Sequence, residues 1–434
     1  MSVGLLDRAR AAARPELTGA VVGAMGLTLT VEGIPAAVGD LVEVDPGPQG
    51  LLAEVVAVSR ERLTCMPLGE LSGVHSGARV RATGRPLQVP VGDALLGRVL
   101  DGLGRPVDGG TPLGPGVEFV DLASETPHVL SRSRVQEPLT TGVRALDTLV
   151  PCGKGQRLGI FAGSGVGKST LLAQITRGTD ADVRVIGLIG ERGREVREFL
   201  EENLGPEGMA RTVVVVATSD EPPLVRLRAA FVATRIAEGF RDQGRDVLLM
   251  MDSITRTAMA QREVGLSAGE PPATRGYPPS VFAMLPRLLE KAGTAATGSI
   301  TGLYTVLVDG DDHNEPIADT ARSILDGHVV LTRRLATAGH FPAIDVLESI
   351  SRVASAVVPP AQMADARELR RLMGALRDVR ELVEIGAYQA GSDPLVDRAR
   401  QLAPAVEAFL QQPTGDLTTP DEAWAWLGRV VRST

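Results

Sequence analysis

Hydrophobic and polar positions follow one rhythm at the start of the chain. Between residues 16 and 85 the apolar residues form short, β-branched runs separated by Gly, Pro and Asp, namely AVVG, LTLTVEG, LVEV, LLAEVVAVS and ARVRATG. Short runs with turn residues at close intervals are typical of a small sheet or barrel. We therefore expect an N-terminal β-barrel domain over residues 16–85.

The pattern changes between residues 86 and 352. A proline-rich connector that reaches Pro138 is followed by buried apolar runs, namely RLGIFAG, VRVIGLIGE, TVVVVATS, DVLLMMD, LYTVLVDG and HVVLTRR. Helical stretches separate these runs, which is typical of a mostly parallel sheet covered on both faces. The pattern predicts an α/β core over residues 86–352, with the connector wrapped onto it.

The two ends of the chain read as helical. From residue 353 to residue 434 apolar residues recur at steps of three and four, and we expect them to pack as core: Leu369, Leu372, Met373, Leu376, Val379, Leu382 and Val383. Residues 1–15 fit either a short amphipathic helix or a frayed terminus. The prediction is a short arm, a barrel, an α/β core and a C-terminal helical domain.

Composition narrows the class of protein. The chain has 434 residues, 44% of them hydrophobic and 23% charged, which suits about three folded domains. A net charge of −8 argues against nucleic acid as a partner. Cys65 and Cys152 lack metal-type spacing, so we expect neither a zinc site nor a disulfide framework. No apolar run is long enough to span a membrane and no signal peptide is recognisable, so we expect a cytoplasmic protein.

The strongest chemical signal is the segment RLGIFAGSGVGKSTLL, an apolar strand that enters a Gly-rich turn and opens a helix. Such a turn wraps phosphate oxygens with its backbone amides, while the lysine reaches the terminal phosphates and the serine hydroxyl ligates magnesium. Ala162 stands at the usual first glycine. The predicted nucleotide-binding residues of this loop are Gly163, Ser164, Gly165, Val166, Gly167, Lys168, Ser169 and Thr170.

Two carboxylates at strand ends would complete such a site. Asp252 closes the apolar run DVLLMMD and would supply the second anion that holds magnesium. Glu191 follows another buried run and would orient and polarise the attacking water. Glu195, one turn later, fits this role or an exposed helix face with alternating charge equally well.

Four motifs give the chain a family resemblance. They are TGVRALDTLVPCGKGQRLGIFAGSGVGKSTLL, GERGREVREFLEE, MDSITRTAMAQREVGLSAGEPPATRGYPPSVF and GHFPAIDVLESISRV. In this order and spacing they resemble the type III protein-export ATPases, relatives of the catalytic subunits of F-type and V-type rotary ATPases. The segment GAYQAGSDPLVDRA, with Gly386, Ala387 and Tyr388, is more similar to the flagellar members than to those of virulence injectisomes.

The resemblance implies roles for individual residues. Lys168 and Ser169 would bind phosphate and magnesium, with Asp252 as the acid on the magnesium side. Glu191 would be the catalytic carboxylate, and Arg192 its neighbour close to the phosphate.

Two further residues gain a role only through the resemblance. Arg352 in SISRV matches an arginine finger that acts in the neighbouring subunit's site, and Phe341 matches an aromatic residue that lies against adenine. Thr257 departs from the family, which more usually has an aromatic residue there.

The implied fold is a RecA-like P-loop ATPase core with an N-terminal β-barrel and a C-terminal helical domain, assembled as a homohexamer that uses ATP and Mg²⁺. The implied partners are a stator-like regulatory protein, an export gate and export chaperone–substrate complexes. We expect a peripheral position at the inner face of the cytoplasmic membrane. Family members contact the regulatory protein and the membrane through the N-terminal arm, which is short here, so we expect these contacts to be reduced.

The leading hypothesis is an ATP hydrolase that energises flagellar type III protein export. An injectisome ATPase of the same family is the alternative. A second alternative is a non-catalytic nucleotide-binding ring subunit, although the intact GERGRE segment disfavours it. A hexameric nucleic-acid translocase is a third, disfavoured by the acidic charge and by the lack of Phe, Tyr or Trp between residues 16 and 85.

Overall fold

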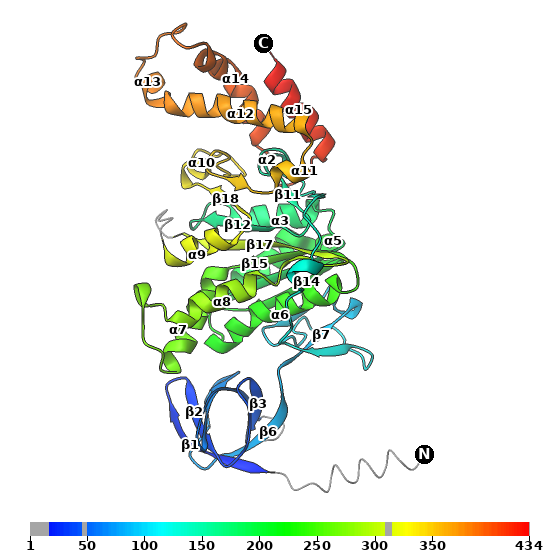
Figure 1. Cartoon of the computed structure of the whole chain (residues 1–434), viewed down its shortest axis with the longest axis vertical. Helices are drawn as coiled ribbons and strands as arrows, with labels where there is room; N and C mark the ends of the chain where they lie inside the picture. Colours follow the sequence, from blue (N-terminus) through cyan, green and yellow to red (C-terminus); the bar gives the residue numbers. More distant parts are fainter. Residues whose placement is uncertain (1–16, 46–49, 309–314, 434) are drawn as a thin grey trace.

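The computed structural model describes residues 17–45, 50–308 and 315–433. The arm expected over residues 1–15 lies outside this part of the chain. The described residues form a barrel, a central α/β core and a helical end, in that order along the long axis (Figure 1). None of the helices in these ranges combines the length and the apolar character needed to cross a membrane.

The first domain is a closed barrel of antiparallel strands in the order β1-β2-β5-β4-β3-β6, which confirms the predicted fold of this region. Its strands are β1 (Thr18–Met25), β2 (Thr28–Glu32), β3 (Asp40–Val44), β4 (Leu51–Ser59), β5 (Arg62–Pro67) and β6 (Arg79–Pro86). Strand β5 was not among the predicted runs. Its sequence RLTCMP lacks β-branched alternation, and only the turn at Arg60, with a φ of 47°, separates it from β4.

The connector packs onto the core as predicted. Strands β7 (Gln88–Val91) and β9 (Glu118–Asp121) pair with each other, while β8 (Val99–Asp101) joins the edge of the central sheet beside β14. Two hydrogen bonds from Arg98 to Asp108, of 2.6 and 2.8 Å, brace the chain next to β8. The short strand β10 (Pro138–Leu139) pairs with β11 (Cys152–Gly153) just before the core begins.

The central sheet has the order β19-β18-β12-β17-β15-β13-β14-β8, with β16 paired to β17. Pairing is parallel from β18 to β8, and antiparallel only for β16 and β19. The remaining strands are β12 (Arg157–Ala162), β13 (Val183–Ile189), β14 (Thr212–Ala217), β15 (Asp246–Asp252), β16 (Gly293–Thr294), β17 (Ser299–Leu307), β18 (Gly327–Leu331) and β19 (Ile350–Ser351).

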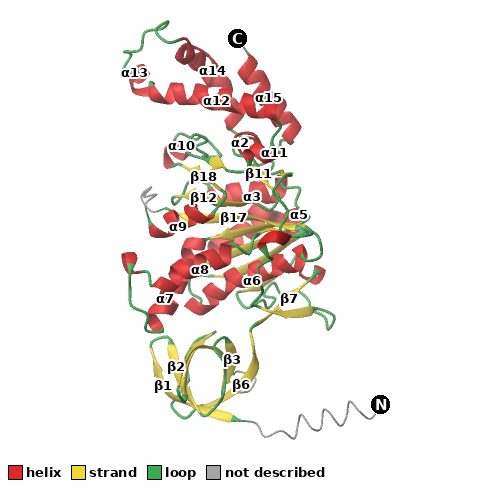
Figure 2. Ribbon diagram, viewed as in Figure 1, coloured by secondary structure: helices red, strands yellow, loops and turns green. Residues whose placement is uncertain are grey.

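Helices cover both faces of this sheet (Figure 2). Successive strand residues point to opposite faces, so that Met251 joins the apolar layer under α6, α7 and α8, and Met250 the layer under α2 and α3. The helices are α2 (Arg144–Leu149), α3 (Lys168–Gly178), α4 (Gly193–Glu198), α5 (Gly205–Met209), α6 (Pro223–Arg241), α7 (Ile254–Ser267), α8 (Pro279–Leu289), α9 (Pro316–Ile324), α10 (Arg333–Thr337) and α11 (Ala354–Val357).

The C-terminal domain is helical, as predicted. Its helices are α12 (Pro360–Asp378), α13 (Arg380–Glu384), α14 (Pro394–Leu410) and α15 (Pro420–Arg432). The apolar stripe is core at Leu369 and Leu372, but Leu382 is 48% exposed, so the prediction that the whole stripe packs as core is wrong at its end. The reason is a break at Val379, where the backbone (φ −104°, ψ 6°) leaves the helical conformation and α13 starts in a new direction.

Candidate active site

The Gly-rich loop follows the carboxyl end of β12, a strand flanked on both sides by parallel neighbours. Gly165 and Gly167 have φ values of 75° and 84°, and a Cβ atom on Gly165 would meet nothing within 4 Å. Val166, 1% exposed, anchors the loop in the core beneath it. Ser164, Ser169 and Thr170 are exposed. The loop therefore leaves its amides and the first turn of α3 open to an anion.

Three charged groups predicted from separate strand ends meet at this loop. The Nζ atom of Lys168 lies 2.5 Å from Oδ1 of Asp252 and 3.5 Å from Oε1 of Glu191. Asp252 is 3% exposed and also accepts a hydrogen bond of 2.7 Å from the hydroxyl of Thr305. They meet because β12, β13 and β15 are parallel, so their carboxyl ends share one edge of the sheet.

The side chain of Glu191 is more buried than that of Glu195, with 14% exposed against 50%. Burial raises the pKa of Glu191 above its ordinary value, and the positive charges of Lys168 and Arg256 partly oppose this. A carboxylate with a raised pKa is a stronger base toward water. Glu195 is half exposed and lies 3.4 Å from Arg192, whose side chain is 81% exposed. The structure thus brings Glu191 to the loop, while Arg192 faces solvent and the half-exposed Glu195 lies beside Glu191, where its hydrogen bond and negative charge also raise the pKa of Glu191.

The oxygen donors at the loop fit a magnesium ion. The hydroxyl of Ser169 and the carboxylate of Asp252 are hard ligands of the kind Mg²⁺ prefers when phosphate and water supply the rest of its shell. Within the described ranges no three His, Cys, Asp or Glu residues gather into a metal cage. A site with one carboxylate beside a phosphate loop needs no such cage.

Phe341 lies at the same edge of the sheet. A Cβ atom on Gly167 would stand 3.3 Å from two ring carbons of Phe341, so the ring packs against the phosphate loop. The side chain is 45% exposed, which leaves part of the ring open to a planar group. The loop and Phe341 together outline a place for a nucleotide, with phosphate at one end and base at the other.

Arg352 lies far from its own phosphate loop. Its N–H donates to the carbonyl of Asp326 (3.0 Å), and the N–H of Asp326 donates to Arg157, the first residue of β12. The phosphate loop follows the last residue of that strand, five residues further on, or roughly 16 Å away. Arg352 therefore belongs to the amino edge of the sheet.

Family models match three successive parts of the chain. The beta-barrel domain of the ATP synthase alpha/beta family matches residues 21–84, its nucleotide-binding domain residues 142–351, and the T3SS EscN ATPase C-terminal domain residues 358–429. The chain is 50% identical to a flagellum-specific ATP synthase of Bacillus subtilis over 94% of each chain. It belongs to the type III protein-export ATPase family.

Relatives in this family have two kinds of name. A type 3 secretion system ATPase of Xanthomonas euvesicatoria is 52% identical over 92% of this chain and 91% of its own. The assembled ATPase EscN of enteropathogenic E. coli is 46% identical, covers 95% of this chain with the whole of its own, and has a TM-score of 0.90. In complex with its central stalk EscO, EscN gives a TM-score of 0.89.

Some residues at the site of this export ATPase were not predicted. Arg256 packs its side chain against Gly190, and its Nε atom is buried without a hydrogen-bond partner. No pattern separates it from the many other arginines. Thr305, which holds Asp252, did carry a signal, because it is a polar residue inside the apolar run LYTVLV. Thr257 is fully buried and donates to the carbonyl of Ser253 (3.1 Å), so a threonine fits the position where the family more usually has an aromatic residue.

Proposed function

We propose that this export ATPase hydrolyses Mg-ATP at the subunit interfaces of a homohexamer and so energises flagellar type III protein export. The observation that carries the proposal is the meeting of Lys168, Glu191 and Asp252 at an open phosphate loop. A lysine held between two carboxylates at a strand edge suits γ-phosphoryl transfer to water, which depends on positioning and charge stabilisation.

Each residue has one task in this mechanism. The loop amides and Lys168 bind the β- and γ-phosphates. Ser169 and Asp252 would hold Mg²⁺, which would neutralise phosphate charge when bound. Glu191 accepts a hydrogen bond from a water molecule and orients it for in-line attack on the γ-phosphorus, while the bond from that phosphorus to ADP breaks. Arg192, on the exposed side of Glu191, contacts the phosphate region at the assembled interface.

The position of Arg352 supports shared sites. At the amino edge of the sheet it cannot reach its own loop, whereas a neighbouring subunit can receive it as an arginine finger, a group worth about 10³ to 10⁵ in rate. The likeness to assembled EscN and to its complex with a central stalk supports self-association and a stalk-like regulatory partner. We further propose that the export gate and export chaperone–substrate complexes are partners of this protein. We also propose that it lies peripherally at the inner face of the cytoplasmic membrane.

The injectisome role is a second candidate, because relatives of both kinds have about the same identity to this chain. The flagellar role is favoured by Gly386, Ala387 and Tyr388. In the structure Tyr388 lies 3.1 Å from a carboxylate oxygen of Asp397, which fixes the loop after α13. Deletion of the gene, followed by measurement of secreted hook protein and of needle or effector proteins, distinguishes the two. Loss of needle or effector secretion alone would refute the flagellar role.

The catalytic assignment is tested by Glu191→Gln in assembled rings. We expect ATP turnover to fall by about 10²- to 10⁴-fold, because the amide cannot polarise water. The matched control is Glu201→Gln, which alters an exposed carboxylate paired with Arg197 and should change turnover by less than about threefold. Parental turnover by Glu191→Gln would refute the mechanism. No turnover by the parental chain would favour a non-catalytic ring subunit, and stimulation by RNA would favour a nucleic-acid translocase.

A further inference from the structure

Gln412 occupies the junction between the phosphate-loop domain and the C-terminal helices. It is 2% exposed and follows α14 by two residues. Its Oε1 atom accepts from the N–H of Arg144 (2.8 Å), and its Nε2 atom donates to the carbonyls of Gly142 (2.8 Å) and Asp416 (2.6 Å). The side-chain amide is therefore fixed through both its acceptor and its donor.

The backbone of the same residue holds Phe341. The N–H of Gln412 donates to the carbonyl of Phe341 at 2.9 Å. The Phe341 ring in turn packs against Gly167 of the phosphate loop. Gln412 thus connects the backbone of Phe341 to α2 and to the segment after α14.

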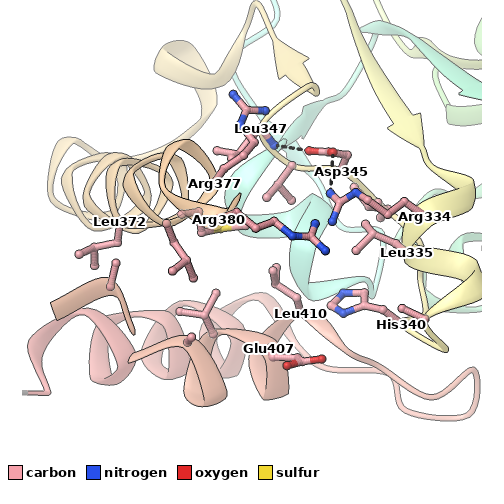
Figure 3. A pocket seen from close by; sticks show the side chains of 18 of the residues that line it. Arg334, Leu335, His340, Asp345, Leu347, Leu372, Arg377, Arg380, Glu407 and Leu410 are labelled. Atoms are coloured by element: carbon pink, nitrogen blue, oxygen red, sulfur yellow. Dashed lines mark hydrogen bonds and ion pairs between the residues drawn. The ribbon is translucent and has the colours of Figure 1, made fainter. Parts of the chain in front are cut away.

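The residues on either side of Phe341 have other contacts: Ala343 is 1% exposed and its carbonyl accepts from the N–H of Thr332 (2.9 Å). A cavity of about 500 Å³ lies between α10, α12 and α14, and the ring of His340 points into it (Figure 3). Burial lowers the pKa of His340, so this ring is neutral near pH 7. The backbone N–H of His340 is held by the carbonyl of Leu335 at 3.0 Å. Beside this cavity, the contact to Gln412 is one of several that fix the segment, and it acts on Phe341 itself.

The helix that begins at the phosphate loop contacts the same segment. In α3, Arg177 donates to the carbonyl of Thr414 (2.8 Å) and Gln174 to that of Asp416 (3.4 Å). Residues 411–418 therefore contact both the helix that begins at the phosphate loop and the segment that carries Phe341. The distance between the phosphate loop and Phe341 depends on how firmly residues 411–418 are seated.

We propose that Gln412 is a positioning residue for the nucleotide base: it seats Phe341 at the distance from the phosphate loop that a purine base requires. It acts through Phe341 and touches no reacting atom. The inference rests on the proposed nucleotide site, and it concerns recognition of the base alone. It therefore predicts an effect on ligands that carry a base and none on ligands that consist of phosphate only.

The test measures equilibrium binding to the full-length chain with Mg²⁺ present, so that it does not depend on turnover. In Gln412→Met, which keeps the volume and removes the amide, we expect the Kd for ATP to rise about 5- to 30-fold, the effect of weakened stacking of one base. The Kd for inorganic tripolyphosphate should stay within about twofold. The matched control is Arg370→Ala, because Arg370 also ties the helical domain to the core, through the carbonyls of Leu149 and Ser349, but does not touch Phe341.

Three results would overturn the inference. The first is an unchanged Kd for ATP in Gln412→Met. The second is an equal rise for tripolyphosphate, which would mean general loosening. The third is an undiminished effect of Gln412→Met in a Phe341→Ala background, which would mean that Phe341 is not the link. Gln412→Glu, which keeps the acceptor for Arg144 and loses the donors, serves as a second variant if Gln412→Met does not fold. Failure of ATP turnover alone would count against the proposed function and leave these binding ratios intact.

Discussion

Replacing Arg144 by alanine should detach the C-terminal helices from the core. The side chain is 3% exposed, and its guanidinium carbon lies 4.6 Å from the centre of the Trp426 ring. It bonds four acceptors around the end of α14: the Phe409 carbonyl (2.9 Å), the Gln411 carbonyl (2.5 Å), the Asp416 carboxylate (2.7 Å) and the Thr418 hydroxyl (2.9 Å).

The magnitude follows from what alanine leaves behind. The carbonyls of Phe409 and Gln411 lose their side-chain donor, at about 1–3 kcal/mol each. Loss of the desolvated contact with Trp426 adds about 1–2 kcal/mol. The carboxylate of Asp416 is 43% exposed and can be hydrated, so its loss counts for little. The expected destabilisation is about 4 kcal/mol, which comes mainly from the two buried carbonyls and the Trp426 contact.

Tryptophan fluorescence measures this directly, because the chain has two tryptophans, Trp424 and Trp426, and both lie on α15. In urea, with a slope of about 1–3 kcal/mol per molar, the fluorescence midpoint of Arg144→Ala should fall by at least about 1.3 M. The control Arg371→Ala removes an exposed pair with Glu368 and should shift the midpoint by less than about 0.5 M. A shift for Arg144→Ala as small as that of the control would refute the reasoning.

Three further predictions concern the site and the sheet edge. ATP turnover should fall as the pH drops through the raised pKa of Glu191, because only the ionised carboxylate polarises water. A pH–rate profile measures this, and a rate that rises on acidification would contradict it. Gly167→Ala places an alanine at a φ of 84° and pushes its Cβ atom against Phe341, so the KM for ATP should rise about tenfold or more. The control Gly39→Ala has a similar φ of 95° but open space around it. It should lower stability by about 1–2 kcal/mol in thermal unfolding and leave the KM unchanged. Hydrogen bonds from Arg98 lower the pKa of Asp108, so this carboxylate stabilises the fold above its unfolded pKa near 4 and loses that contribution as the pH falls further. Asp108→Ala should lower the free energy of unfolding by about 1–2 kcal/mol at pH 7. In urea titrations the difference in stability between parent and variant should narrow below about pH 4, and a difference that widens there would be inconsistent.

The sequence was most informative for features that depend on residues close together along the chain. Asp252 and Glu191 could be predicted because a buried parallel strand puts whatever follows it at the ligand edge of a sheet. Strand β5 was missed because its pairing comes from closure of the barrel and not from its own alternation. Gln412 gave no signal at all: its partners Gly142 and Phe341 lie 270 and 71 residues away along the chain. The expected boundaries of the domains stay predictions, since secondary structure alone does not define them.

The separation of Arg352 from its own phosphate loop has a genetic consequence. If each site draws its lysine from one subunit and its finger from the next, Lys168→Ala and Arg352→Ala chains are each inactive alone but complement each other. In randomly mixed rings about a quarter of the interfaces join an intact loop to an intact finger, since each condition is met by half of the subunits. Two defective alleles expressed in one cell should then restore part of the activity, whereas two alleles that both damage the loop should restore none.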